Sequence, residues 1–239
     1  MANRTVSTAV SVHGTNPQYL VDKIIRHRIY DSLYWKEHCF GLTVTGVMGK
    51  AADISSIGGC YGANDKPTEF LCLALKLLQL QPDRAIVDEL INQEDFKYLR
   101  ALAVFYLRLT ESSIEIYRAL EPLYKDYRKL RRRMSDGSYD LTHMDDFADS
   151  LLHESWVCNI TLPRLSKRIA LEDVGELSPR ISPLDEDSDT DDAQPTRAVW
   201  KAKSKKKNNT AGRAATGAAT SRGTAYSPPG LGGTEPAAV

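Results

Sequence analysis

Apolar residues recur every three or four positions through most of the first 180 residues, which is the spacing of one helical face. The first such stretch, 16–33, opens with Asn16-Pro17, an N-cap side chain followed by a proline suited to a first helical turn. Residues 70–80 are apolar nearly all round and predict a helix central to the core. The same spacing predicts further helices at 85–91, 96–109, 116–130, 144–151 and 165–171.

Prolines and polar residues mark the expected ends of these helices. Pro67 is expected to open the central helix. Pro122 should kink or split the 116–130 stretch, because its ring clashes with the preceding turn. Thr142, with Asp145 three residues on, resembles a capping box for the helix that follows.

One β element is expected among the helices. Asp136-Gly137 is a two-residue hairpin signal, with Met134 before it and Tyr139 and Leu141 after it. The chain shows no strand–helix alternation and no repeat of fixed period. The sequence therefore predicts an all-α class: a compact multi-helix domain with one short β-hairpin.

The composition changes near residue 180. The last 59 residues hold only two of the 19 aromatic residues, Trp200 and Tyr226, and collect Pro, Gly, Ala, Ser and Thr instead. Such a segment cannot bury enough apolar surface to offset the entropy of ordering it. We therefore expect a helical domain over 1–180 and a disordered C-terminal tail over 181–239.

Cysteine usage and hydropathy indicate a soluble protein of a reducing compartment. The four cysteines form no C-x-x-C pair and are expected to be buried, unpaired thiols. Residues 1–14 have no apolar signal-peptide core, and the longest apolar run, 101–107, is far too short for a membrane span. No membrane association is expected.

Equal numbers of basic and acidic residues, 31 of each, exclude a uniformly basic nucleic-acid wrapper. The tail nevertheless separates its charges into an acidic block, 185–192, and a basic block, 197–207. Ser188 and Thr190 lie among the acids and suit an acid-directed kinase. The basic block resembles a nuclear localisation signal, and we therefore expect a nuclear protein. The residues of this signal are Lys201, Lys203, Lys205, Lys206 and Lys207.

No arrangement in the sequence predicts catalysis, a metal or a cofactor. The glycine cluster 58–62 lacks the G-K-[ST] ending of a phosphate-binding loop and is expected to be a tight turn between helices. His38 and Cys39 are adjacent on a predicted helix and point apart. A set of acids and histidines on the helix after residue 142 lacks metal-ligand spacing: His143, Asp146, Asp149 and His153. The protein is not expected to be an enzyme.

The run 118–133 is the most unusual charged feature of the folded part. It carries seven basic residues against two acids, with Tyr117 directly before it and Tyr124 and Tyr127 within it. One interpretation is a basic surface with aromatic edges for phosphates or an acidic partner. The other is the solvated face of an amphipathic helix whose tyrosines point into the core. For the tyrosines we favour the second interpretation, and for the arginines both stay open.

Ordered blocks over roughly 3–178 resemble the pre-mRNA-splicing factor 38 family. They include Gly58-Gly59-Cys60-Tyr61-Gly62 and, in chain order, residues 15–26, 34–37, 66–68, 70–73, 77–82, 96–100, 106–110, 120–124, 126–129, 147, 151–153 and 162–165. One departure concerns the tail, since animal members carry many Arg-Ser dipeptides there and this tail has little beyond Ser221-Arg222. Functions that depend on such dipeptides are therefore not expected to carry over.

The resemblance implies an all-helical, non-catalytic scaffold of the spliceosome. Family members travel with the tri-snRNP particle and act when the precatalytic spliceosome is activated. The partners that the resemblance implies are a splicing zinc-finger protein and a microfibril-associated-protein-type splicing factor, bound largely through helices laid on the scaffold.

We expect partner contacts on two segments, the arginine-rich face of residues 128–133 and the loop of residues 61–66. The residues concerned are Arg128, Arg131, Arg132, Arg133, Tyr61, Asn64 and Lys66. The alternative function is direct RNA binding through the 128–133 run, helped by the lysine-rich tail. Weak RNA contact within the assembly is compatible with either function.

Overall fold

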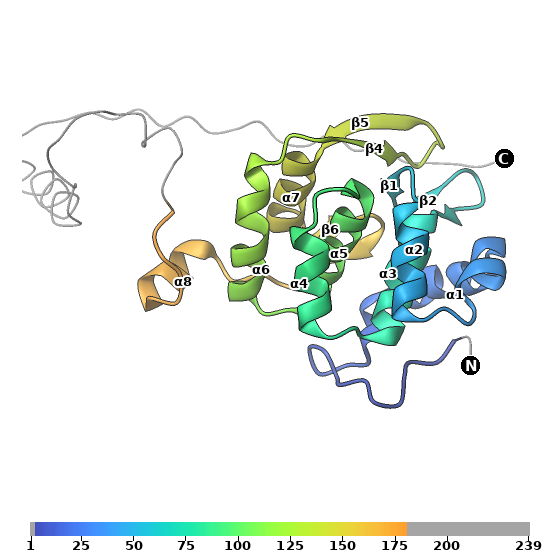
Figure 1. Ribbon diagram of the computed structural model, residues 1–239, viewed down its shortest axis with the longest axis horizontal. Coiled ribbons are helices and arrows are strands. Elements are labelled where there is room, and N and C mark those ends of the chain that lie inside the picture. Colours follow the sequence, from blue (N-terminus) through green and yellow to red (C-terminus); the bar gives the residue numbers. More distant parts are fainter. Residues whose placement is uncertain (1–2, 181–239) are drawn as a thin grey trace, which may run out of the picture. The chain divides into compact units, whose positions relative to one another are not determined.

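The computed structural model describes residues 3–180, and the predicted disorder, phosphorylation sites and nuclear localisation lysines of the tail lie outside these residues. Within the described part, helices surround a central pair (Figure 1). The α-helices are α1 (Lys23–Asp31), α2 (Val44–Ala52), α3 (Glu69–Leu80), α4 (Arg84–Asn92), α5 (Lys97–Thr110), α6 (Ser113–Leu120), α7 (Met144–His153) and α8 (Arg168–Val174). Shorter helical turns are η1 (Pro17–Leu20), η2 (Trp35–Cys39) and η3 (Glu121–Lys125).

Helices α3 and α5 form the centre of the core. Most residues of both helices are buried, which confirms the prediction for the apolar 70–80 stretch. The Phe70 ring lies 5.6 Å from the Phe105 ring and 6.4 Å from the Phe147 ring of α7, centre to centre. Helices α2, α4, α6 and α7 pack against α5, so this pair anchors the other elements.

A side-chain cap explains the start of α3, and some predicted helix starts are corrected. Thr68, not Pro67, precedes α3, and its hydroxyl accepts a hydrogen bond from Leu71 N at 3.3 Å. Pro67 lies in a strand instead. The predicted capping box is wrong, because Thr142 is a buried strand residue and α7 begins after His143, which makes no side-chain cap.

The predicted helix over 16–33 is divided. Asn16 caps only the single turn η1, where its side chain accepts a hydrogen bond from Gln18 N. The chain then becomes extended at Val21, and α1 begins at Lys23. The last predicted helix, 165–171, begins three residues later than expected, as α8.

Short strands make the all-α prediction incomplete. They are β1 (Ile57–Gly58), β2 (Cys60–Tyr61), β3 (Lys66–Pro67), β4 (Lys129–Arg133), β5 (Tyr139–His143), β6 (Trp156–Val157) and β7 (Ile160–Thr161). The hairpin expected at Asp136-Gly137 is confirmed as β4–β5, antiparallel. β1 pairs in parallel with β4, which gives a three-stranded sheet of order β1-β4-β5, and β2–β3 and β6–β7 are separate two-stranded pairs.

The predicted helix over 116–130 is wrong beyond Leu120. Pro122 ends α6 as expected and leaves only the turn η3. From Lys129 onward the backbone is a strand in which Leu130 alone is fully buried. The arginine run is therefore not one face of an amphipathic helix. Of its tyrosines, Tyr117 is buried, whereas Tyr127 is 70% exposed and does not point into the core.

The glycine cluster is a strand junction and not a turn between helices. Gly59 lies against the two turn residues of the β6–β7 hairpin, Cys158 and Asn159, both in the left-handed region of φ. Asn159 Oδ1 accepts a hydrogen bond from Cys60 N at 2.7 Å. A Cβ at Gly59 would lie 2.0 Å from that oxygen, so this close approach requires glycine.

Within residues 3–180, no helix is long and apolar enough to cross a membrane. The four cysteines are free thiols, three of them buried and Cys158 partly so. The predicted unpaired state is confirmed.

Candidate interaction surface

The β4–β5 hairpin places its side chains on two faces. Leu130 of β4 and Thr142 of β5 are buried and belong to the core face. The alternate residues share the opposite face, because side chains alternate along a strand. We call this opposite side the basic sheet face: Lys129, Arg131 and Arg133 of β4, and Tyr139, Leu141 and His143 of β5.

Aromatic rings lie against the arginines of the basic sheet face. The guanidinium carbon of Arg131 lies 4.3 Å from the centre of the Tyr139 ring. That of Arg133 lies 3.6 Å from the Tyr61 ring centre and 5.1 Å from the Tyr139 ring centre. Such cation–π contacts hold the charges in place without neutralising them.

The structure brings the two predicted contact segments together. β1 ends at Gly58, which is paired with Arg133, so the chain that leaves β1 passes beside the arginines and supplies Tyr61. Gly62 N also donates a hydrogen bond to the Ser135 carbonyl at 2.7 Å. Asn64 and Lys66 are exposed in the loop that follows. The 61–66 loop and the arginine strand are therefore parts of one surface.

Not every predicted arginine belongs to this surface. Arg128 binds Asp126, at 2.6 Å between Nη2 and Oδ2, and its pKa is raised by the hydrogen bond to that carboxylate. Arg132 projects from β4 toward Asp140 and forms an exposed ion pair at 2.8 Å. Within residues 3–180, Arg131 and Arg133 have no carboxylate within 4.0 Å. These two arginines therefore remain available for an external anion.

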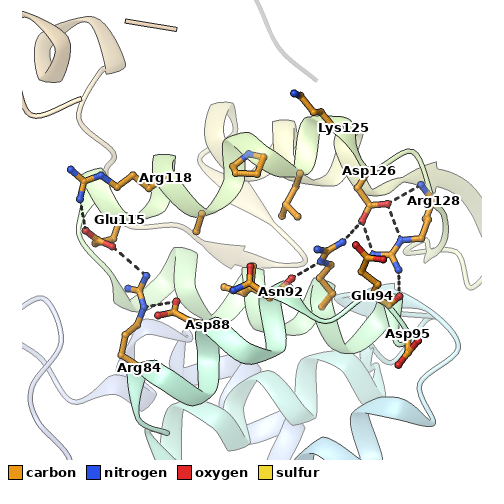
Figure 2. A pocket seen from close by; sticks show the side chains of 15 residues that line it. Arg84, Asp88, Asn92, Glu94, Asp95, Glu115, Arg118, Lys125, Asp126 and Arg128 are labelled. Carbon is orange, nitrogen blue, oxygen red and sulfur yellow. Dashed lines mark hydrogen bonds and ion pairs between the residues drawn. The ribbon is translucent and has the colours of Figure 1, made fainter. Parts of the chain in front are cut away.

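A second candidate is the groove of 820 Å³ between α4, α6 and the segment after η3 (Figure 2). Its charges are largely paired with one another. Figure 2 shows Glu115 between Arg84 and Arg118, at 3.3 and 3.1 Å, and Asp126 beside Arg128. A groove whose cations and carboxylates are already paired presents little net charge to a partner, in contrast to the basic sheet face.

The side chains considered for chemistry do not form a reactive site. His143 pairs with Asp146 at 3.3 Å, and His153 pairs separately with Asp149 at 3.0 Å. His143, Asp145 and Asp146 have ligand atoms within 4.8 Å of one another, a grouping typical of acids in the first turn of a helix.

The thiol of Cys39 also lacks the environment of a nucleophile. The residue is fully buried, and burial raises its pKa to about 12. A nucleophilic cysteine needs the opposite shift, toward the thiolate. His38, its neighbour, contacts Glu37 and the Tyr34 ring instead.

Sequence reasoning missed Lys129, Tyr139 and Leu141 as members of the basic sheet face. The signal was present, because the turn at Asp136-Gly137 sets the hairpin register. Extending the alternation of a hairpin outward from that turn places these residues opposite the arginines. The helical interpretation of the preceding residues concealed this alternation.

Comparison with known proteins matches most of the chain to splicing factors. Pre-mRNA-splicing factor 38A of Xenopus laevis is 58% identical over 189 residues, and that of Homo sapiens is 57% identical over the same length. Each match covers 79% of this chain and 61% of the relative, so the chain spans less than two thirds of these relatives.

A solved structure matches the fold. It is a chain in the crystal structure of the Snu23–Prp38–MFAP1(217–258) complex of Chaetomium thermophilum, 39% identical with a TM-score of 0.70. The match covers 83% of this chain and 99% of that chain. The model of the PRP38 family matches residues 10–175. The chain therefore belongs to the PRP38 family.

Proposed function

We propose that this protein is a non-catalytic protein-interaction scaffold of the spliceosome, required for pre-mRNA splicing. The observation that carries the proposal is the structural match to a chain solved within the Snu23–Prp38–MFAP1 complex, over nearly the whole of that chain. The geometry agrees with a binding role, because Arg131 and Arg133 are held by aromatic rings and not by acids. A core of packed helices supports that surface.

The partners follow from the same comparison. That complex contains Snu23 and a segment of MFAP1. The family resemblance implies a splicing zinc-finger protein and a microfibril-associated-protein-type splicing factor as partners. We expect the corresponding proteins to bind this chain, largely through amphipathic helices that bury apolar area on it. The resemblance to the family further favours association with the tri-snRNP particle and action at the precatalytic-to-activated transition.

A nuclear location fits this role. The lysine-rich block at 201–207 has the composition of a nuclear localisation signal, and splicing takes place in the nucleus. Replacing its lysines by glutamine in a fluorescently tagged full chain should reduce nuclear accumulation. Unchanged accumulation would show that the chain enters the nucleus by another route, such as with a partner.

The test of the proposed function is depletion and add-back. Removing the protein from a splicing-competent nuclear extract of its own source should block splicing before activation, and adding the purified full chain should restore it. Affinity purification of the tagged full chain from the same extract should recover the zinc-finger and MFAP1-type proteins. Undiminished splicing after complete depletion, with no splicing protein recovered, would refute the proposal.

Direct RNA binding is a second candidate function, favoured by the row of cations and tyrosines on the basic sheet face. If it operates, affinity of the full chain for single-stranded RNA should fall steeply with salt, because cations that bind phosphates release counterions. Charge reversal at Arg131, Arg132 and Arg133 should then weaken RNA binding and flatten the salt dependence. Equal binding by this variant and the wild type would exclude the basic sheet face as the RNA site.

A further inference from the structure

One edge of the three-stranded sheet carries unpaired backbone groups. β5 is the terminal strand, on the outer side of β4 (Figure 1). Met144 N donates to the Arg128 carbonyl at 3.0 Å, and this bond shows which residue pairs along β4 and β5 are hydrogen-bonded to each other. Antiparallel pairs alternate between bonded and non-bonded, so every second residue of β5 turns its N–H and C=O away from β4. These residues are Tyr139, Leu141 and His143, the last of which directly precedes α7. Within the described chain no backbone group pairs with those of Tyr139 and Leu141.

The other edge of β4 is already covered. β1 pairs with its last residues, through Ile57 and Gly58. Nearer its start, Arg131 N donates to the Tyr98 hydroxyl at 3.2 Å, and Lys97 Nζ donates to the Lys129 carbonyl at 2.7 Å. The contrast is informative, because the same sheet satisfies one edge with side chains from α5 and leaves the other open.

The open edge lacks the usual protection against strand addition. Natural edge strands are commonly blocked by lysines, prolines or bulges. β5 contains none of these, and its single charged residue, Asp140, is paired with Arg132 on the opposite face. Tyr139 and Leu141 are instead 46% and 56% exposed. A regular edge that exposes Tyr139 and Leu141 and carries no lysine, proline or bulge is suited to receive another strand.

The charge beside this edge selects the type of strand. The guanidinium group of Arg131 lies over the Tyr139 ring, so this side chain reaches from β4 across β5 toward the open edge. That of Arg133 lies between the Tyr61 and Tyr139 rings, nearer to Tyr61. Neither has a carboxylate partner within the described residues, and the Nε of Arg133 is buried without a hydrogen-bond acceptor. Acidic side chains on an incoming strand would lie within reach of these cations.

We propose that an extended acidic segment of a partner protein adds to β5 as the fourth strand of this sheet. Its backbone pairs with Tyr139 and Leu141, and its carboxylates bind Arg131 and Arg133 on the basic sheet face. Its alternate, apolar side chains lie on the opposite face, beside Asp140 and Thr142. Main-chain hydrogen bonds supply affinity in this mode, and side chains supply selectivity. A peptide fits better than RNA, because only a peptide backbone offers alternating donors and acceptors that match a strand edge.

This proposal deepens the scaffold function and depends on it for the biological setting of the partner, but its test is independent of splicing. The probe is an end-capped peptide of eight residues that alternates glutamate and valine, titrated into the ¹⁵N-labelled full chain. Amide shifts should be largest at Tyr139 and Leu141, and hydrogen exchange of these two amides should slow.

Two changes separate strand addition from simple charge attraction. The same peptide N-methylated at two adjacent central residues keeps every charge but cannot pair along either edge, and it should bind about tenfold more weakly. In the protein, Leu141→Pro removes an N–H that points away from β4 and should weaken binding to a similar degree. Leu141→Thr retains that N–H and should lose less affinity for the peptide. Circular dichroism verifies that both variants fold.

Charge is tested by Arg131→Glu, with Lys23→Glu on α1 as the matched control of equal charge change. Only Arg131→Glu should strongly lower the affinity for the peptide. If the N-methylated peptide binds as well as the unmodified one, the proposal is wrong. It is also wrong if the peptide is indifferent to Leu141→Pro while an eight-nucleotide uridine RNA binds the same face and loses affinity with Arg131→Glu. Intact peptide binding by a chain that recovers no splicing proteins would refute the scaffold function alone.

Discussion

Arg100 on α5 binds the carboxylate of Asp126, with Nη1 and Oδ2 2.8 Å apart, where the chain leaves η3 for β4. Both side chains are largely buried, at 14% and 11% exposure. Arg128 binds the same carboxylate. This cluster joins the core helix to the strand that carries the basic sheet face, so the position of that face depends on it.

Asp126→Asn should therefore destabilise the protein. The variant leaves two arginines facing a neutral amide in a largely buried site, and we expect a loss of about 2–3 kcal/mol in the free energy of unfolding at pH 7. Urea denaturation followed by circular dichroism measures this. Asp140→Asn is the control, because its ion pair with Arg132 is exposed and should contribute less than about 1 kcal/mol.

The Asp126 cluster also predicts a pH dependence. Hydrogen bonds from Arg128 hold the pKa of Asp126 below its ordinary value of 3.8. A lowered pKa in the folded state contributes stability above the unfolded value, and that contribution disappears as the pH falls through the folded value. The stability difference between wild type and Asp126→Asn should thus be full at pH 7 and shrink below about pH 4. A difference that stays constant down to pH 2 would contradict the assignment.

Arg108 is the most deeply buried cation of the described core, and its removal should be costly. Its Nε donates to the Leu151 carbonyl at 2.7 Å and its Nη2 to the Pro163 carbonyl at 2.9 Å, which ties α5 to the end of α7 and to the following segment. Arg108→Met fills similar space but leaves two carbonyls unpaired, and we expect a loss of about 2–4 kcal/mol.

The control for Arg108 is Arg118→Met, since the Arg118 side chain is 58% exposed and its ion pair with Glu115 should contribute less than about 1 kcal/mol. Urea denaturation of both variants provides the comparison. Equal stability of the two would show that the hydrogen bonds of Arg108 contribute no more than a surface pair.

The sequence predicted those elements whose signals are local. The apolar run of α3, the break at Pro122 and the turn at Asp136-Gly137 each depend on neighbouring residues only, and all three are confirmed. β4 was mistaken for helix because four of its five residues are charged and Leu130 alone marks its core face. A strand with one buried residue shows no alternation in hydropathy.

The sequence predicts the two parts of the candidate surface only as separate segments, because they come together through contacts between residues far apart in the chain. Tyr61 meets Arg133 only because β1 pairs in parallel with β4 across more than seventy intervening residues. A two-residue strand such as β1 carries too little pattern to be recognised alone. The open edge of β5 is likewise a property of the sheet order, which depends on tertiary pairing and not on local sequence.

The approach of Gly59 to the β6–β7 turn predicts a contrast between two glycines. Gly59→Ala would push a methyl group against the Cys158 backbone and Asn159 Oδ1, and should cost about 1–3 kcal/mol. Gly49→Ala, in the interior of α2 with no atom near its Cβ position, should instead stabilise the protein by about 0.5–1 kcal/mol. Thermal unfolding of both variants measures the sign directly, and destabilisation by both would contradict the contrast.

The free thiols should be nearly inert in the native protein. Burial raises the pKa of Cys39 and of Cys158 to about 12, and it raises the pKa of Cys60 and Cys72 as well. At pH 8 a thiol of pKa 12 is ionised to a fraction of about 10⁻⁴, and the thiolate is the reactive form. Ellman's reagent should therefore react slowly with the folded protein and rapidly with all four cysteines in denaturant.

The same reagent connects this reactivity to the Gly59 contact. Cys158 is the one cysteine that is partly exposed, so its low reactivity depends on the packing of its own turn. Gly59→Ala displaces the Cys158 backbone and should raise the reaction rate of that thiol, whereas Gly49→Ala should not. Cys158→Ser in the Gly59→Ala background identifies the reacting group, because it should abolish the added rate. A fast native thiol that survives Cys158→Ser would place the accessible cysteine elsewhere and contradict this account of the turn.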